Sequence, residues 1–342
     1  DYIARGLARI LGVEEESIRQ RMEKLNSGYE IIKKKAPQAE ADEVRRFVNG
    51  EIDDEGNEVP EKERKKLHGV YLEPDSKRYY PNGTLAAQVI GFVNADNDGA
   101  YGLESYYNSA LTGTSGMTVT AKNAAGKTML YDYEQYYDAE NGANLVTTLD
   151  STVQYYLEKG LEEMIAKFDP KNGATGIVMD VRNGAVLGMA SSPDYDLNDP
   201  SAIQDSVLQS TLNKIRNTST EEEYEAALNA AQLKQWNNKT LNTTYEPGST
   251  FKPIVVAAGL EEGTITDNST FVCTGKVHIG DWDIRCSARS GHGTQTLKVA
   301  TGNSCNPAFV TMGLKIGTEA YYRYLKSFGL METTGIDLPA EA

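Results

Sequence analysis

The most informative segment is Tyr245-Glu246-Pro247-Gly248-Ser249-Thr250-Phe251-Lys252-Pro253. Its Pro-Gly pair predicts a turn that delivers the chain into a helix, with Ser249 at the helix N-terminus. Pro253 then falls within the first turn, where a missing backbone N–H is tolerated. Because residues three apart share one face of a helix, we expect Lys252 to reach the Ser249 hydroxyl.

This Ser-x-x-Lys spacing suits nucleophilic catalysis. A serine hydroxyl is a poor nucleophile until a base removes its proton. A lysine can be that base when burial or a neighbouring charge lowers its pKa toward neutrality. The helix N-terminus adds backbone N–H groups and the positive end of the macrodipole, which stabilise an oxyanion. The spacing alone arises by chance about once in a chain of this length, so its meaning depends on context.

A second polar motif, Ser304-Cys305-Asn306, lies in a helix that we expect over about residues 295–312. Ser304 offers a second hydroxyl that can relay protons, and the Asn306 amide can hold a substrate peptide group. Cys305 would fill space beside the pocket. Trp236 and Tyr245 precede the nucleophile and are candidates for lining a substrate groove, although packing is the commoner role of aromatic residues.

The surrounding sequence predicts helices layered on strands. Asp150 or Ser151 caps a helix with an apolar stripe, which Pro170 ends. Residues 174–181 and 185–190 predict a hairpin around Asn183-Gly184, a dipeptide typical of a type I′ turn. Residues 201–235 are polar and helical, which is typical of an insertion.

The first half of the chain differs in its residue types and in the elements that they predict. Residues 1–36 predict helices, and residues 39–66 are mostly charged, which favours a solvated surface or loop. Residues 78–83 predict the end of a strand and a turn. Residues 117–148 predict a β-ribbon with turns near Ala125-Gly126 and Asn141-Gly142. We place a domain boundary near residue 145.

Composition narrows the class of protein. The 342 residues correspond to about two domains. Lys and Arg number 34 against 49 Asp and Glu, a net charge of −15, which argues against a nucleic-acid partner. No run of eighteen apolar residues marks a membrane span. The chain opens in mid-helix at Asp1 and closes at Ala342 without a stop signal, so both ends look cut.

Taken together, the motifs resemble a class B penicillin-binding protein, a peptidoglycan D,D-transpeptidase, of the elongation or sporulation type of Gram-positive bacteria. The resemblance rests on residues 245–253, on Gly291-His292-Gly293 before Ser304-Cys305-Asn306-Pro307, on the hairpin 176–192, on residues 78–83 and on Gly102-Leu103-Glu104. It implies the α+β class, with an elongated pedestal or dimerisation domain over residues 1–145. Residues 146–342 would then be the first part of a transpeptidase domain, with helices packed on an antiparallel sheet.

The resemblance also implies roles for the motif residues. Ser249 would attack the carbonyl of a D-Ala–D-Ala bond and form an acyl-enzyme, with Lys252 as the base. Ser304 would shuttle a proton to the leaving amine, and Asn306 would hold the peptide. β-Lactams would acylate the same serine, and the chemistry needs no cofactor.

The family's third motif, Lys-Thr-Gly or Lys-Ser-Gly, is absent up to Ala342, so we expect the transpeptidase domain to be incomplete at its C-terminus. The implied partners are peptidoglycan stem peptides, β-lactams and a membrane glycosyltransferase of the wall-synthesis complex. The implied location is the extracytoplasmic face of the bacterial cytoplasmic membrane, through an N-terminal anchor that this chain lacks.

Two alternatives compete with this interpretation. A class A β-lactamase shares the first two motifs, but its Glu-x-x-Leu-Asn string should follow Ser304, and the match here, Glu225-Ala226-Ala227-Leu228-Asn229, precedes Ser249. A non-catalytic scaffold of the cell-wall synthesis complex is the second alternative, in which the pedestal docks partners.

Cysteine and histidine gather just before the second motif. Cys273, His278, Cys286 and His292 have a spacing unlike that of a standard zinc finger, so buried thiols beside structural histidines are the simpler interpretation. A structural zinc site that uses two or three of these residues is the sharper one. A disulfide between Cys273 and Cys286 is a third option outside the cell.

Overall fold

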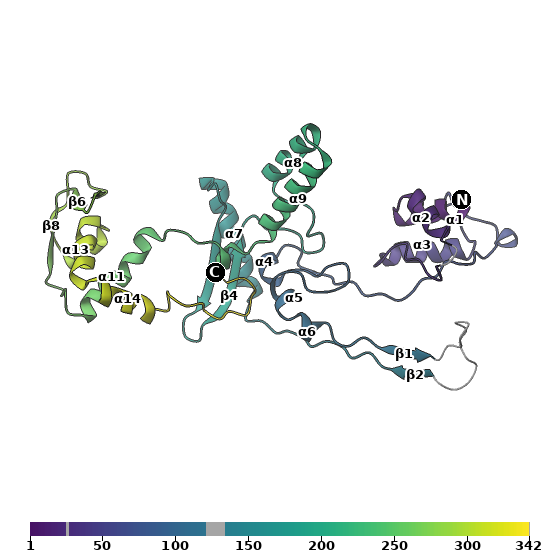
Figure 1. Cartoon of the computed structure of the whole chain (residues 1–342), viewed down its shortest axis with the longest axis horizontal. Coiled ribbons are helices and arrows are strands. Elements are labelled where there is room, and N and C mark those ends of the chain that lie inside the picture. Colours follow the sequence, from purple (N-terminus) through teal and green to yellow (C-terminus); the bar gives the residue numbers. More distant parts are fainter. Residues whose placement is uncertain (25–26, 121–133, 342) are drawn as a thin grey trace. The chain divides into compact units, whose positions relative to one another are not determined.

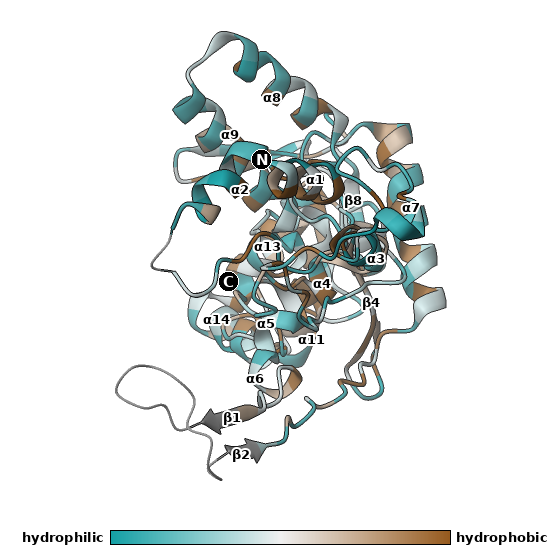
Figure 2. Ribbon diagram, turned by 90° about the vertical axis from the view of Figure 1, so that its right-hand side faces the viewer, coloured by the Kyte–Doolittle hydropathy of each residue, from teal (hydrophilic) through white to brown (hydrophobic). Residues whose placement is uncertain are grey.

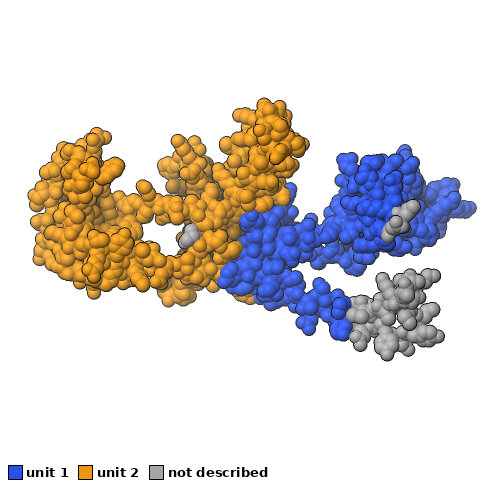
Figure 3. Space-filling view, in the orientation of Figure 1, with its two compact units in different colours: residues 1–84, 91–145, 196–200 blue, residues 85–90, 146–195, 201–342 orange. Residues whose placement is uncertain are grey.

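A computed structural model describes residues 1–24, 27–120 and 134–341. The chain forms two compact units, drawn in separate colours in Figure 3. The first unit contains residues 1–84, 91–145 and 196–200, and the second contains residues 85–90, 146–195 and 201–342. The domain limits expected from the sequence stay a prediction.

Helices α1 (Tyr2–Leu11), α2 (Glu15–Met22) and α3 (Gln38–Val48) form one core of the first unit. Its buried side chains come from all three helices and the following loop: Ala4, Leu7, Ile10, Leu11, Ile18, Val44, Phe47 and Ile52. The interpretation of residues 39–66 as a solvated surface or loop did not predict helix α3, although most of its side chains are indeed solvated. Val44 and Phe47 lie three apart and bury one face of an otherwise charged helix.

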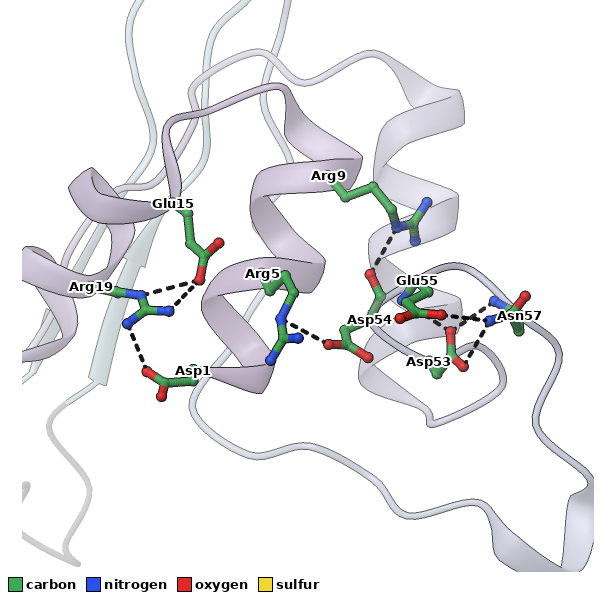
Figure 4. A network of polar contacts seen from close by, with 9 residues as sticks. All are labelled: Asp1, Arg5, Arg9, Glu15, Arg19, Asp53, Asp54, Glu55 and Asn57. Atoms are coloured by element: carbon green, nitrogen blue, oxygen red, sulfur yellow. Dashed lines mark hydrogen bonds and ion pairs between the residues drawn. The ribbon is translucent and has the colours of Figure 1, made fainter.

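Ion pairs link this helical core to the loop that follows α3 (Figure 4). Arg5 contacts the Asp54 carboxylate at 3.1 Å, and Arg9 donates to the Asp54 carbonyl at 3.0 Å. Asp53 Oδ1 accepts from the Glu55 backbone N–H at 3.0 Å, which makes an Asx turn, and from the Asn57 backbone N–H at 2.8 Å, which closes the loop. Short-range polar contacts therefore order a segment that has few apolar residues.

The rest of the first unit contains short elements. These are η1 (Glu61–Glu63), α5 (Gly102–Tyr106), α6 (Asn108–Leu111), β1 (Met117–Thr120) and β2 (Glu134–Tyr137). Strands β1 and β2 pair antiparallel, as the predicted ribbon requires, but its extension to residue 148 was wrong, since residues 141–148 form no strand. The turn expected at Ala125-Gly126 lies outside the described residues. The strand expected before residue 81 was wrong, since residues 71–80 form no strand.

An ion pair with a buried carboxylate orders the segment around residue 80. Arg78 Nε lies 2.6 Å from Glu104 Oε1, and the Glu104 side chain is only 7% exposed. The Tyr80 hydroxyl accepts from the Val93 backbone N–H at 3.2 Å. Burial and the nearby Glu104 carboxylate raise the pKa of Tyr80. Two motifs that suggested the family, residues 78–83 and Gly102-Leu103-Glu104, thus meet in space.

In the second unit, helix α7 (Ser151–Phe168) packs on a hairpin of β3 (Thr175–Asp180) and β4 (Ala185–Ser191). Asp150 caps α7 by accepting from the N–H groups of Thr152 and Val153, as predicted. The buried Gln154 exchanges two hydrogen bonds with the Met189 backbone, at 2.8 and 2.9 Å. Helix α4 (Ala87–Ile90) also contacts β4.

The hairpin turn differs from the expected type I′. Strand pairing ends at Asp180 and Ala185, so the loop has four residues. Gly184 has φ +77°, but Asn183 is not among the residues with positive φ. A type I′ turn requires positive φ at both central positions, which Asn183 does not provide.

Helices α8 (Ser206–Thr218) and α9 (Glu221–Trp236) form the predicted polar helical segment, followed by α10 (Lys239–Asn242). The first two run side by side (Figure 1), and α8 is largely hydrophilic (Figure 2). Thr220 and Glu223 form a capping box at the start of α9.

The remaining part of the second unit carries both polar motifs. Its helices are η2 (Gly248–Phe251), α11 (Lys252–Glu261), α12 (Leu297–Gly302), α13 (Asn306–Ile316) and α14 (Thr318–Ser327). Its strands pair as β5 (Thr270–Cys273) with β8 (Gly293–Thr296) and β6 (Lys276–Ile279) with β7 (Trp282–Arg285), all antiparallel. The core includes Ala258, Phe271, Ala300, Phe309 and Met312. Helices and antiparallel strands confirm the α+β class.

Candidate active site

Ser249 lies three residues before the start of helix α11. It belongs to the 3-10 turn η2, and the α-helix proper begins at Lys252. Gly248 has φ +60°, a left-handed conformation that glycine adopts without strain. The expected α-helical start at Ser249 was therefore early by one turn. The Ser249 side chain is exposed.

Lys252 reaches toward the second motif. Its Nζ donates to Ser304 Oγ at 2.9 Å, to the Ser304 carbonyl at 2.8 Å and to Asn306 Oδ1 at 2.6 Å. An ammonium has three N–H donors, and these three acceptors satisfy them. The structure thus brings together three of the four predicted catalytic residues.

The expected contact between Ser249 and Lys252 is not formed. Among the described residues, no hydrogen bond joins the Ser249 hydroxyl to the Lys252 ammonium. Residues three apart do share a face in a 3-10 turn, but the ammonium is already engaged by Ser304 and Asn306.

Ser304 sits in a break between two helices, where one continuous helix was predicted. It has φ +49°, and α12 ends at Gly302 while α13 begins at Asn306. Pro307 explains the break, because proline has no N–H to donate to the carbonyl four residues earlier. The break turns the Ser304 hydroxyl and carbonyl toward Lys252.

Asn306 is held from both ends of its amide. Its nitrogen donates to the Arg285 carbonyl at 2.8 Å, while its oxygen accepts from Lys252. This pair of contacts fixes the amide orientation and ties the start of α13 to the end of β7. The amide is therefore positioned before any ligand arrives.

Burial perturbs the lysine. It lowers the pKa of Lys252, against the opposing influence of the Cys286 and Cys305 thiols. The Lys252 ammonium also lies 5.1 Å from the centre of the Phe309 ring, a cation–π distance. A depressed lysine pKa is what a general base at this position requires.

The sequence did not predict two contacts of the site, that of the Phe309 ring with Lys252 and that of the Arg285 carbonyl with Asn306. Phe309 follows Asn306 by three residues on α13, so helical spacing is the signal that could have revealed it. The Arg285 carbonyl carries no signal in the residue type, because any residue offers a backbone oxygen.

Two aromatic residues precede the site in the sequence. Trp236 ends α9 and Tyr245 is 80% exposed. Their role in lining a substrate groove stays a prediction.

A second cluster lies beside the motif. The ligand atoms of Cys273, Cys286, His292 and Cys305 all lie within 4.8 Å of one another. His278 is absent from this cluster and instead contacts Asp283 at 3.0 Å. The disulfide considered between Cys273 and Cys286 is not formed, because all three cysteines are free. Cys305, expected only to fill space, is the fourth member.

The arrangement suits acyl transfer. An exposed serine precedes a half-buried lysine, and the lysine contacts a second serine and an anchored amide. Such a set can move a proton between lysine and the second hydroxyl while the amide orients a peptide group.

No described helix is long and apolar enough to cross a bilayer.

The chain matches known protein domains and sequences. The model of the penicillin-binding protein dimerisation domain matches residues 1–147, and that of the penicillin binding protein transpeptidase domain matches residues 174–342. Stage V sporulation protein D of Bacillus subtilis is 36% identical, over 85% of this chain and 42% of its own length. Peptidoglycan D,D-transpeptidase FtsI of Escherichia coli K12 is 28% identical, over 81% of this chain and 41% of its own length.

A solved structure agrees on the fold. The complex between penicillin-binding protein PBP2 and MreC from Helicobacter pylori matches with a TM-score of 0.66 at 24% identity, covering 98% of this chain and 59% of that one. The chain spans about two fifths of the length of the curated relatives named above. With its two matched domains in this order, the chain belongs to the class B penicillin-binding proteins.

Proposed function

We propose that this chain carries the nucleophile, base and proton relay of a peptidoglycan D,D-transpeptidase. The observation that supports it most is that Lys252, three residues after the exposed Ser249, contacts both Ser304 and Asn306. The relatives named above span more than this chain, so the activity belongs to the gene product that contains it.

In the first half-reaction, Ser249 Oγ attacks the carbonyl carbon of the penultimate D-Ala of a stem peptide. Lys252, in its neutral form, takes the hydroxyl proton. The C–N bond breaks, and the terminal D-Ala leaves as an amine after it receives a proton through Ser304. Asn306 holds the donor peptide by its amide while the ester forms.

In the second half-reaction, the neutral amine of a neighbouring stem peptide attacks the ester carbonyl and gives up one proton to the Lys252–Ser304 pair. The new amide bond forms as the bond to Ser249 Oγ breaks, and the pair passes that proton to Ser249 Oγ. A β-lactam follows the first half-reaction only. Its ring amide opens and leaves the drug attached to Ser249 as a stable ester.

The partners and location follow from the same proposal. Stem peptides and β-lactams are the ligands of the serine, and a membrane glycosyltransferase is the partner that supplies glycan strands. The Helicobacter pylori protein forms a complex with MreC, which makes a scaffold partner of that kind a second candidate. We place the gene product on the outer face of the cytoplasmic membrane, with an anchor outside this chain.

The test is intact mass spectrometry of the gene product after incubation with a penicillin. We expect a mass gain equal to one drug molecule, and its loss in Ser249→Ala. Thr250→Ala is the matched control, because Thr250 carries the neighbouring exposed hydroxyl, which among the described residues bonds only to the Pro247 carbonyl. It should keep the adduct. A folded gene product that gains no mass would contradict the proposal and favour the scaffold alternative.

A further inference from the structure

We propose that Arg285 binds a carboxylate of the donor stem peptide, in the residues that precede the scissile bond. The inference rests on the proposed function and adds a specificity-determining residue to it. Arg285 is exposed and ends β7, and its carbonyl accepts from the Asn306 amide nitrogen at 2.8 Å. Its side chain therefore starts from a backbone that touches the residue assigned to hold the donor peptide.

The Asn306 amide keeps a donor for the substrate beside Arg285. An amide nitrogen carries two N–H donors, and the Arg285 carbonyl takes one of them. Among the described residues, no hydrogen bond uses the second. A peptide carbonyl that accepts from it would lie next to the Arg285 backbone. Side chains of that peptide would then come within range of the long arginine side chain.

Strand register places Arg285 on one face of the β6–β7 hairpin. Side chains alternate across a strand, so four exposed residues share this face: Lys276, His278, Asp283 and Arg285. Asp283 is the only acidic residue of the four. It is already engaged by Lys276 Nζ at 2.6 Å and by His278 Nδ1 at 3.0 Å. The positive charge of Arg285 is therefore left uncompensated on this face.

The position of Lys276 adds a reason for an anionic ligand. Lys276 stands directly opposite Arg285 in the strand register. Like charges at directly opposite positions destabilise an antiparallel pair. Within the described part of the chain, no carboxylate pairs with the Arg285 guanidinium. A carboxylate bound there would relieve the repulsion, so the arrangement favours an anion over an empty surface.

The chemistry of the side chain fits a carboxylate. A guanidinium is always charged, and its paired N–H donors match the two oxygens of a carboxylate. The chain as a whole has a net charge of −15, so most of its surface repels anions. A local cation beside Asn306 would attract an anionic donor to the site. Stem peptides carry carboxylates that are either free or amidated, and Arg285 would favour the free form.

The test compares two penicillins on the gene product. Carbenicillin is benzylpenicillin with one additional carboxylate on its side chain, and that side chain takes the place of the peptide ahead of the scissile bond. We expect Arg285→Gln to lower the ratio of acylation rates, carbenicillin over benzylpenicillin, by roughly three- to tenfold. This range lies between the effect of an exposed ion pair and that of a buried charged hydrogen bond. Intact mass measured over time gives both rates.

The matched control is Arg289→Gln. Arg289 is exposed and carries the same charge four residues later, but among the described residues no hydrogen bond joins it to Asn306. This variant should keep the ratio of the unchanged protein. Arg285→Lys retains the charge and should keep most of the ratio. Added salt should lower the ratio of the unchanged protein but not that of Arg285→Gln, because salt screens exposed charges.

Two results would overturn this inference alone. In one, both drugs acylate Ser249 and Arg285→Gln keeps the original ratio. In the other, Arg289→Gln lowers the ratio as much as Arg285→Gln does, which marks a long-range field in place of a contact. If neither drug acylates the unchanged gene product, the proposed function fails and this inference fails with it. Acylation by benzylpenicillin therefore distinguishes the two failures.

Discussion

Among single residues, Lys252 links the two polar motifs. Its ammonium reaches the Ser304 hydroxyl, which lies in the break between α12 and α13, and the Asn306 amide at the start of α13. Spacing in the sequence correctly identified these residues as a group. It could not show that the lysine bonds to the second serine, because that contact depends on packing between segments far apart in the chain.

We predict that β-lactam acylation depends on the protonation of Lys252. Only the neutral amine can accept the Ser249 proton, so the acylation rate should rise with pH through the pKa of Lys252. Burial lowers that pKa, so the rate should level off at a lower pH than a solvated lysine would give. Acylation rates measured across a pH series check this. A rate that still rises through the ordinary lysine range would contradict it.

We also predict that Ser304→Ala slows acylation by about a hundredfold or more, the usual contribution of a positioned proton relay. Ser304→Gly should show the same loss, because glycine adopts the observed φ of +49° without strain and removes only the hydroxyl side chain. Time-resolved mass spectrometry of the adduct measures both rates. Full activity in the glycine variant would mean that the hydroxyl has no part in the reaction.

Among elements, the long α-helices were more predictable than the short connections. The capped helix α7 and the polar helices α8 and α9 follow directly from caps and periodicity. Helix α3 was missed because only Val44 and Phe47 bury its face, too weak a pattern among eleven residues. The break before α13 was missed although Pro307 signalled it.

The contact between α1 and α3 gives a prediction of its own. A Cβ on Gly6 would lie 2.2 Å from Cζ of the buried Phe47 ring. Gly6→Ala should therefore lower the free energy of unfolding of this core by about 1–3 kcal/mol, as overpacking does, despite the better helix propensity of alanine. Faster hydrogen exchange in α1 and α3 would report the loss.

The matched control is Gly160→Ala in α7, where nothing lies within 4 Å of the added carbon. This change should stabilise its helix by roughly 0.5–1 kcal/mol, because alanine restricts the unfolded chain. Equal effects of the two substitutions on local hydrogen exchange would show that the clash with Phe47 does not change the stability of this core.

For the whole molecule, the order of motifs predicted the family, and two matched domain models confirm it. The sequence did not predict the exact cluster of cysteine and histidine side chains. Linear spacing grouped His278 with the cysteines, but β6 and β7 turn it toward Asp283. Cys305 lies nineteen residues beyond Cys286, and only the fold brings their sulfurs to 3.9 Å. Tertiary structure, which local pattern does not encode, decides such clusters.

The central claim is that Ser249 is the nucleophile of this molecule. Its most direct test is peptide mapping by tandem mass spectrometry of the gene product after reaction with a penicillin. We predict that the drug is attached to Ser249 alone, within the peptide that also contains Lys252. Attachment to Ser304 or to another side chain would contradict it.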